Sequence, residues 1–266
     1  MKMASRSQGF IDQGKFSILG IRVNAINYEA AVARIMAAAR HRLPLSLSAL
    51  AVHGVMTGGL DAEQGYRLNQ LDLIVPDGQP VRWALNGLHR AGLTDRVYGP
   101  TLMLKVCDRA AQAGLPIYLY GSQSQVLEAL QANLQKQFPQ LQVAGCQPSK
   151  FRQVSEQEQA EIAQGIRESG AAIVFVGLGC PRQEVFAYEM RARLEMPLIA
   201  VGAAFAFHAG MLSQAPSWMQ RNGLEWFYRL TREPGRLWKR YLTTNPAFLT
   251  RLALQKARLL HRDRDE

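Results

Sequence analysis

A single carboxylate stands directly after one of the apolar runs of this chain, where it could act in acid–base chemistry. The run LDLIV at 71–75 predicts a buried strand, and Pro76, Asp77 and Gly78 follow it. Pro, Asp and Gly are also common turn residues for local backbone reasons, so a plain turn is the alternative. If the strand belongs to an α/β sheet, Asp77 lies at the mouth of that sheet and is the candidate general base.

Glycine-rich loops follow two further predicted strands and are candidates for holding a diphosphate. Gly121 ends the strand at 115–121, and Gly177 and Gly179 end the strand at 171–179. Such loops bring backbone N–H groups close to phosphate, and the helix that follows adds a favourable partial charge. A plain strand-to-helix turn is the alternative. Neither loop completes the G-x-G-x-x-G pattern, and there is no Walker A lysine, which argues against a nicotinamide or P-loop site.

Other polar residues next to predicted strands could bind a ligand. Gln183 and Glu184 lie in the first turn of a predicted helix, where they face a ligand or only complement the helix dipole. Arg96, close to the corner that begins at Gly99, could hold a diphosphate, and a solvated arginine is the alternative. His53 comes just after a predicted strand, and a hydrogen-bonded turn histidine is the alternative.

The elements that must position these residues alternate between strand and helix. Strands continuous in Val, Ile and Leu predict an α/β fold, with a Rossmann-like, mostly parallel sheet covered by helices on both faces. In such a sheet ligands bind outside the carboxyl ends of the strands, which is where the candidate residues fall. Strands are expected at 17–25, 43–52, 71–75, 115–121, 141–145, 171–179 and 197–205, and helices at 28–40, 80–88, 102–114, 124–138, 155–170 and 181–194.

The character of the chain changes near residue 216, so we expect a core at 1–215 and a basic helical appendage at 216–266. From 219 to 266 there are eleven Lys and Arg against five Asp and Glu, with Trp and Tyr interleaved. This composition suits an anionic membrane surface, and packing on the core or a grip on nucleic acid are the alternatives. The arginines expected to serve membrane association and closure of the site are Arg229, Arg232, Arg236 and Arg240.

The last helical stretch, 248–262, reads as an amphipathic helix with a basic face, as in interfacial segments. The basic face is expected to hold Arg251, Gln255, Arg258 and Arg262, and the apolar face Phe248, Leu249, Leu252, Leu259 and Leu260, with Lys256 among them.

Bulk composition limits the class of protein and its partners. The net charge of +10 and the pI of about 9.8 predict an anionic partner: nucleic acid, a phosphorylated metabolite or anionic lipid. Cys107, Cys146 and Cys180 are far apart and lack metal-ligand spacing, which favours a reduced cytosolic setting. The N-terminus has no signal-peptide pattern, and no apolar run approaches the roughly 20 residues that span a bilayer. Asp263-Arg264-Asp265 lies in a charged tail and is not expected to hold a metal.

Seven pieces of sequence, ordered through residues 17–245, match a known family. They are ILGIRVNAI, VPDG, DRVYGPTLM, YLYG, VGLGCPRQE, VGAAFAFHAG and APSWMQRNGLEWFYRLTREPGR. On these pieces the chain resembles the WecG/TagA/CpsF glycosyltransferases. The resemblance implies inverting, metal-independent transfer from a UDP-sugar to a lipid-diphosphate-linked saccharide, in the synthesis of cell-wall or extracellular polymers. It also implies a peripheral location on the inner face of the cytoplasmic membrane, with no cofactor and no nucleic-acid partner.

The resemblance also suggests roles for individual residues. It makes Asp77 the base, and it places Arg96 and Gln183 with the donor, together with Gly99, Gly121, Gly177, Gly179 and Glu184. Ser48 keeps the hydroxyl of the family's Thr-x-Asn pair and is expected, with His53, to bind the acceptor. Three family positions differ, because the Asn becomes Leu50, the acid of FDF becomes Ala206, and the basic residue before Ala-Pro becomes Gln214.

Two other classes of function fit parts of the sequence. The glycine-rich loops leave open an NAD(P)-dependent oxidoreductase. The basic tail leaves open a nucleic-acid-binding protein, for which duplex binding would depend strongly on salt.

Overall fold

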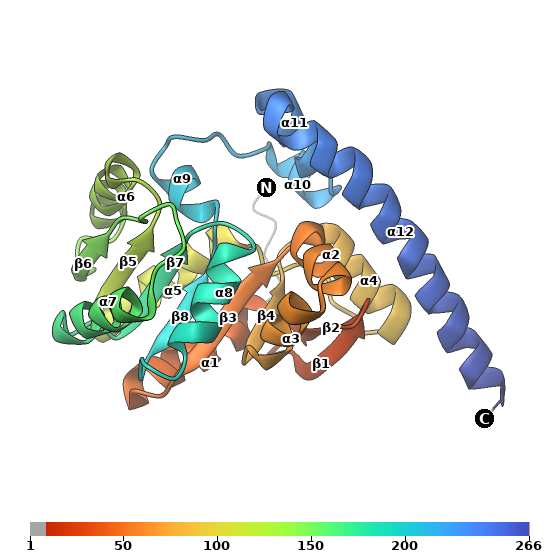
Figure 1. Cartoon of the computed structure of the whole chain (residues 1–266), viewed down its shortest axis with the longest axis horizontal. Helices are drawn as coiled ribbons and strands as arrows, with labels where there is room; N and C mark the ends of the chain where they lie inside the picture. Colours follow the sequence, from red (N-terminus) through yellow and green to blue (C-terminus); the bar gives the residue numbers. More distant parts are fainter. Residues whose placement is uncertain (1–8, 266) are drawn as a thin grey trace, which may run out of the picture.

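The computed structural model describes residues 9–265, without the side chains of Arg236, Arg240 and residues 260–265. At its centre is a six-stranded parallel sheet with the strand order β4-β3-β8-β7-β5-β6 (Figure 1). The strands are β4 (Leu73–Pro76), β3 (Leu45–Leu50), β8 (Pro197–Ala200), β7 (Ile173–Gly177), β5 (Ile117–Gly121) and β6 (Val143–Gln147).

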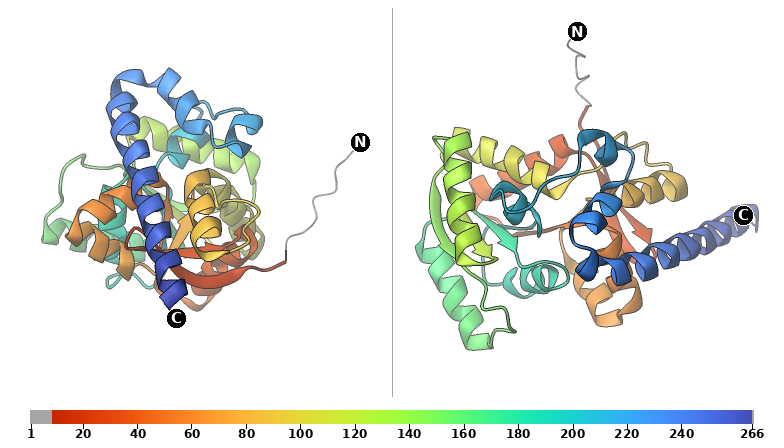
Figure 2. Two further views of the ribbon diagram at one scale, coloured as in Figure 1. Left: turned by 90° about the vertical axis from the view of Figure 1, so that its right-hand side faces the viewer. Right: turned by 90° about the horizontal axis from the view of Figure 1, so that it is seen from above.

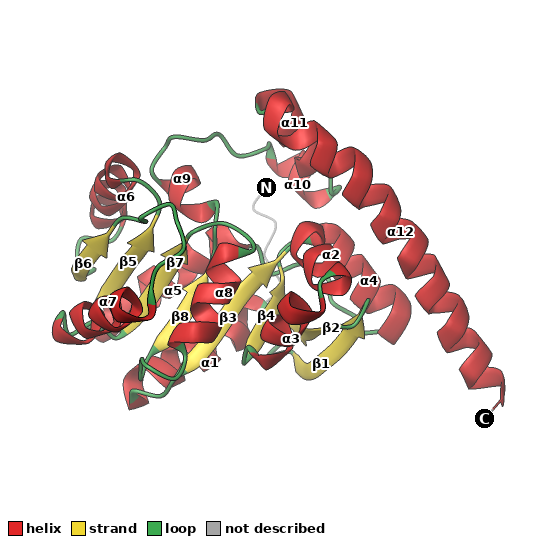
Figure 3. Ribbon diagram, viewed as in Figure 1, coloured by secondary structure: helices red, strands yellow, loops and turns green. Residues whose placement is uncertain are grey.

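Helices cover both faces of this sheet (Figure 3), so the predicted fold class is confirmed. Strand β7 shows why, because its Ile173 and Phe175 join one apolar core and its Val174 and Val176 join another. One face carries α1 (Tyr28–His41), α5 (Gly99–Ala113), α6 (Ser124–Gln137) and α9 (Ala204–His208), and the other α7 (Glu156–Glu168) and α8 (Arg182–Met190).

The segment 17–25, expected to be one strand, contains the turn of a β-hairpin. Strands β1 (Asp12–Ile18) and β2 (Ile21–Ile26) pair in antiparallel fashion. Leu19 and Gly20 reverse the chain between them with φ of 52° and 88°. The apolar pattern runs through this turn without a break, so a reading based on hydrophobicity joined the two strands.

Two helices occupy 52–70, where none was expected. They are α2 (Val52–Leu60) and α3 (Ala62–Gln70), and the side chain of Asp61 caps α3 by accepting from the backbone N–H of two following residues. Gly58 and Gly65 lower helix propensity, yet they let the helices touch, because a Cβ on Gly65 would lie 2.6 Å from the Gly58 carbonyl oxygen.

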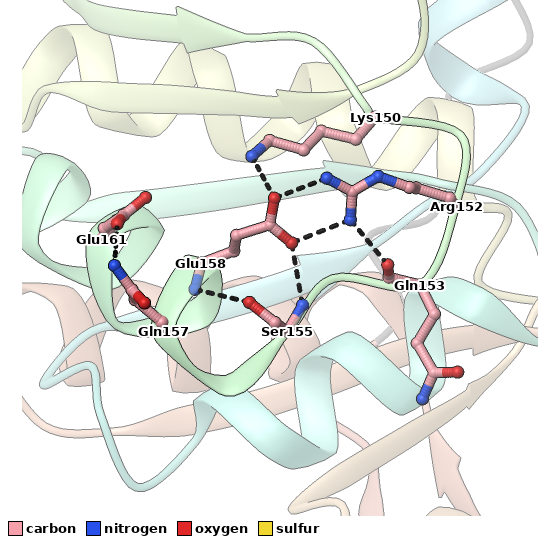
Figure 4. Close-up of polar contacts among 7 residues, drawn as sticks. All are labelled: Lys150, Arg152, Gln153, Ser155, Gln157, Glu158 and Glu161. Carbon is pink, nitrogen blue, oxygen red and sulfur yellow. Dashed lines mark hydrogen bonds and ion pairs between the residues drawn. The ribbon is translucent and has the colours of Figure 1, made fainter.

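The N-terminus of α7 carries a capping box. Ser155 Oγ accepts from the Glu158 N–H at 3.2 Å, and the Glu158 carboxylate accepts from the Ser155 N–H at 2.8 Å (Figure 4). Lys150 and Arg152 also bind Glu158 and lower the pKa of its carboxyl. Because the Arg152 and Lys150 side chains are 57% and 41% exposed, this ion cluster adds little to stability beyond the cap itself.

The appendage consists of α10 (Ser217–Arg221), α11 (Glu225–Arg232) and the long α12 (Pro234–Asp265), which crosses α2 and α4 (Gln79–His89) (Figures 1 and 2). Phe248 is buried in the core cluster that includes residues of α2 and α4. Among the helices in residues 9–265, none combines the length and apolarity of a bilayer-spanning helix.

The predicted faces of α12 need correction. Gln255 lies on the core side and not with the arginines, since its side chain accepts from Leu19 N and donates to Ser17 O, both at 2.9 Å. Seven residues are nearly two helical turns, so Gln255 shares the face of Phe248. Leu249, expected on the apolar face, is 62% exposed.

Candidate active site

Asp77 lies at the carboxyl edge of the sheet, held by three separate elements. Its N–H donates to the Leu50 carbonyl oxygen at the end of β3 (3.1 Å). Its Oδ1 accepts from the N–H of Gly99, the first residue of α5, at 2.6 Å. A Cβ on Gly99 would lie 3.3 Å from this oxygen and 3.2 Å from the Ala49 Cβ, so glycine lets the helix start approach the carboxylate.

The environment of Asp77 favours a carboxyl that titrates near neutral pH. Burial raises its pKa to about 6, against the lowering effects of the Arg96 guanidinium and the Gly99 N–H. The charge of Glu225 raises this pKa further and that of Arg229 lowers it. Two of these four neighbours come from α11, so the appendage is part of the electrostatic setting of the base.

Arg96 is buried beside Asp77 and is engaged by the appendage. It forms an ion pair with the Glu225 carboxylate, and its Nη2 lies 3.5 Å from Gln220 Oε1. Its guanidinium also lies 4.1 Å from the centre of the Tyr98 ring. Glu225 and Gln220 were not among the predicted site residues. Glu225 is one of only two acids between 219 and 262, and this rarity in a basic segment is the signal that could have identified it.

A second buried cluster lies at the same edge, on the side of α8. Glu184 Oε1 accepts from Ser48 Oγ and from Gln183 Nε2, both at 2.9 Å. All three side chains are at most 3% exposed, and burial raises the pKa of Glu184. Glu184 Oε2 and Gln183 Oε1 have no hydrogen-bond partner among the described residues. Glu184 thus contacts neutral donors inside the fold, and Ser48 points at Glu184.

The glycines of the two loops allow neighbouring segments to touch. A Cβ on Gly121 would lie 2.8 Å from the backbone of Gly177, its partner on the adjacent strand. A Cβ on Gly177 would lie 2.5 Å from the ring of Phe205. Gly179 has a φ of +75° and open space around its α-carbon. These loops bring backbone N–H groups to the same edge as Asp77, and phosphate binding there stays a prediction.

The remaining predicted site residues are placed as follows. His53 lies in the first turn of α2, directly after the β3 edge. In α11, the guanidinium of Arg229 lies 3.8 Å from the Glu233 carboxylate, and that of Arg232 lies 5.4 Å from the centre of the Tyr228 ring. Arg236 and Arg240 lie on α12, and their side chains are outside the described part of the structure, as are those of 263–265.

The described side chains include no cluster of three or more His, Cys, Asp or Glu residues that could hold a metal ion. Two buried carboxyls of raised pKa, two arginines and several backbone N–H groups lie at this edge. A parallel sheet with polar groups converging outside its strand ends is the arrangement of an α/β enzyme.

Comparison with known proteins makes the class specific. The model of the glycosyl transferase WecG/TagA/CpsF family matches residues 16–262. A relative from Bacillus subtilis (strain 168) is 31% identical over 190 residues, 71% of this chain and 72% of its own. A relative from Bacillus spizizenii (strain ATCC 23059 / NRRL B-14472 / W23) is 31% identical over 197 residues, 72% of this chain and 74% of its own. Both are named N-acetylglucosaminyldiphosphoundecaprenol N-acetyl-beta-D-mannosaminyltransferase. The chain belongs to this family and is a glycosyltransferase.

Proposed function

We propose that the chain transfers a sugar from a UDP-sugar to a lipid-diphosphate-linked saccharide, with inversion at the anomeric carbon, in the synthesis of a cell-surface polymer. The observation that carries this proposal is Asp77, a buried carboxyl with a pKa of about 6 beside two arginines at the carboxyl edge of the sheet. The names of the relatives supply the acceptor class, a saccharide on a diphospho-polyprenol.

Asp77 acts in this proposal as the general base. A sugar hydroxyl is a poor nucleophile at neutral pH, and a carboxylate within hydrogen-bond reach takes its proton as it attacks. Because the pKa is about 6, most of the carboxyl is ionised at pH 7 while it remains basic enough to accept a proton. The bond to Gly99 N–H fixes Oδ1, which leaves Oδ2 as the oxygen for the acceptor hydroxyl.

The leaving UDP carries the negative charge that develops in the reaction. In our proposal Arg96, Arg229 and the loop N–H groups near Gly121 and Gly179 stabilise it, together with Gln183 on the donor side, and no metal is needed. Arg96 shares its charge with Glu225, so Arg229 supplies the less neutralised guanidinium. Retention of activity in excess chelator is the test of this point.

The appendage brings the site to the membrane in this proposal. Trp218, Trp226, Phe227 and Trp238 are 39% to 55% exposed, although large aromatic side chains are usually buried. They lie on or beside α11 and the start of α12, among the arginines Arg229, Arg232, Arg236 and Arg240. Aromatic and basic side chains together suit the headgroup layer of an anionic membrane, here its cytoplasmic face.

The identity of the sugar is tested together with the reaction. The position of the family Asn is Leu50, which is buried and packs on Gly54, and the position of the family Asp is Ala206. UDP release would be measured from UDP-N-acetylmannosamine and its epimer UDP-N-acetylglucosamine, each with and without a lipid-diphosphate N-acetylglucosamine acceptor. Acceptor-dependent release from one donor, lost in Asp77→Asn, supports the proposal. UDP release that is the same with and without the acceptor, for every donor, contradicts the proposal.

A further inference from the structure

A shallow apolar groove runs between α4 and α12, outside the residues assigned so far. Its volume is about 220 Å³. Trp83 and Leu249 on its sides are 45% and 62% exposed, so its walls present apolar surface to solvent. The full lining is Trp83, Ala84, Gly87, Leu88, Leu249, Leu252, Ala253 and Lys256.

One end of the groove adjoins the candidate active site. Helix α4 begins at Gln79, directly after Asp77-Gly78, and Trp83 lies one turn further along it. The Trp83 ring packs on the turn between α10 and α11, because a Cβ on Gly223 would lie 2.6 Å from it. Two residues after Gly223 is Glu225, the partner of Arg96. The groove therefore starts where the appendage closes over the base.

The charge along the groove fits an anionic amphiphile. The charged side chains of α12 that the structure describes, from 234 to 259, are all basic: Lys239, Arg251, Lys256 and Arg258. Lys256 lines the groove itself, so its aliphatic stem faces the apolar floor while its ammonium can remain in water. An apolar floor with a basic rim matches a hydrocarbon chain attached to a diphosphate.

We propose that the groove between α4 and α12 binds the first units of the polyprenyl chain of the lipid-diphosphate acceptor. This inference rests on the proposed function, which supplies the lipid-linked acceptor, and adds where its chain lies. The chain leaves the acceptor diphosphate at the end of the groove beside the turn between α10 and α11, passes Trp83 and runs along Leu249 and Leu252. The narrow space between two helices suits a single chain better than the flat face of a second protein.

The test compares acceptors that differ only in chain length. kcat/KM would be measured in one detergent for a long polyprenyl-diphosphate acceptor and for the same headgroup on a short alkyl chain. Leu249→Glu places a charge on the groove wall and should lower kcat/KM for the long-chain acceptor about tenfold or more, with little change for the short one. Losing the burial of two CH₂ groups is worth about that factor. Leu254→Glu is the matched control, because Leu254 is 57% exposed on the same helix and does not line the groove.

A second variant and two further measurements separate this inference from its rivals. Ala253→Trp fills the groove without adding charge and should give the same chain-length-dependent loss. Equal losses for both acceptors, or equal losses in Leu249→Glu and Leu254→Glu, would overturn the inference and indicate general membrane contact. A smaller species for Leu249→Glu than for the wild type in light scattering would overturn it in favour of a second copy of the chain. If the wild type used neither acceptor, the proposed function would fail as well, whereas wild-type turnover insensitive to the groove variants would remove only the groove.

Discussion

Asp77 and Glu184 are both buried carboxyls at one edge of one sheet, yet their neighbours differ in charge. Burial raises the pKa of each. Around Asp77 lie the charged groups of Arg96, Arg229 and Glu225, which act on its pKa in opposite directions. The result is a carboxyl with a pKa of about 6, which is mostly ionised at neutral pH and still basic enough to accept a proton, as a general base requires.

The donors around Glu184 are neutral groups and include the Gln183 amide, the Ser48 hydroxyl and the Cys180 thiol. With no cation to stabilise the carboxylate, burial favours the protonated form. The difference shows that burial alone does not make a base. The sheet provides two desolvated carboxyls, and the charges brought by the appendage and the loop at Arg96 distinguish them.

The largest expected effect comes from removing the carboxylate of Asp77. Asp77→Asn keeps the size and the acceptor oxygen for Gly99 N–H but cannot take a proton, so kcat should fall by about 10²- to 10⁴-fold. The measurement is acceptor-dependent UDP release at saturating substrates. Glu184→Gln is the comparison and should retain far more activity. Equal losses in the two variants would show that the contrast between the carboxyls is wrong.

Breaking the ion pair between Arg96 and Glu225 should lower the free energy of unfolding and the pKa of Asp77. Glu225→Gln leaves a buried guanidinium without its counter-charge, and losses of about 3–5 kcal/mol are usual for that change. Because Glu225 raises the pKa of Asp77, the acid limb of the pH–kcat/KM profile should also move to lower pH. Denaturant unfolding and the pH profile measure the two effects. An acid limb that does not move in Glu225→Gln would show that Glu225 does not affect the pKa of Asp77.

Ionised Asp77 should cost the fold stability at neutral pH. Its pKa rises from 3.8 in the unfolded chain to about 6 in the fold, so the native state binds the proton more tightly. The cost is present above pH 6, shrinks as pH falls through this range and is absent below 3.8. The free energy of unfolding of Asp77→Asn should therefore be about 1–3 kcal/mol higher than that of the wild type at pH 7, and the difference should disappear near pH 4. Urea unfolding at both pH values checks the sign.

Removing Glu184 should affect stability more than chemistry. Glu184→Ala leaves the Ser48 hydroxyl and the Gln183 amide without an acceptor, which should lower the free energy of unfolding by about 1–3 kcal/mol. Glu184→Gln retains an acceptor oxygen and should lose less. A pH–rate profile that changes shape in Glu184→Gln would contradict a purely positioning role.

The smallest shift of the acid limb is expected at Arg229, and its sign is opposite to that at Glu225. Arg229 lowers the pKa of Asp77, so Arg229→Gln should move the acid limb to higher pH. The side chain is partly exposed and solvent screens it, so the shift should be modest. Arg232→Gln, on the same helix, serves as the control for general loss of positive charge. Equal shifts of the acid limb in Arg229→Gln and Arg232→Gln would show that the effect comes from net charge and not from the position of Arg229.

Much of the fold was predictable because its signals are local. The parallel strands are continuous apolar runs, Asp77 follows one of them directly, and Ser155 begins α7 with its capping box. The hairpin at Leu19-Gly20 was missed, because a turn of only two residues did not interrupt the apolar pattern.

What the sequence did not predict depends on contacts between distant residues. Ser48 and Glu184 are 136 residues apart, and nothing near either one indicates that they bond. Gln255 looks like a residue of a polar face and instead holds α12 to the β1–β2 turn. Arg96 was expected to bind a ligand, and its partner Glu225 lies in a segment read as basic.

The pairing of Arg96 with the appendage bears on how the enzyme is made. Arg96 and Gln220 are 124 residues apart, and chains fold from the N-terminus as they leave the ribosome. Throughout that interval the guanidinium has neither Glu225 nor Gln220, and the wall over Asp77 does not exist. The sheet can thus assemble early while the site remains open to water. The wall over Asp77 is complete only after synthesis has passed residue 225.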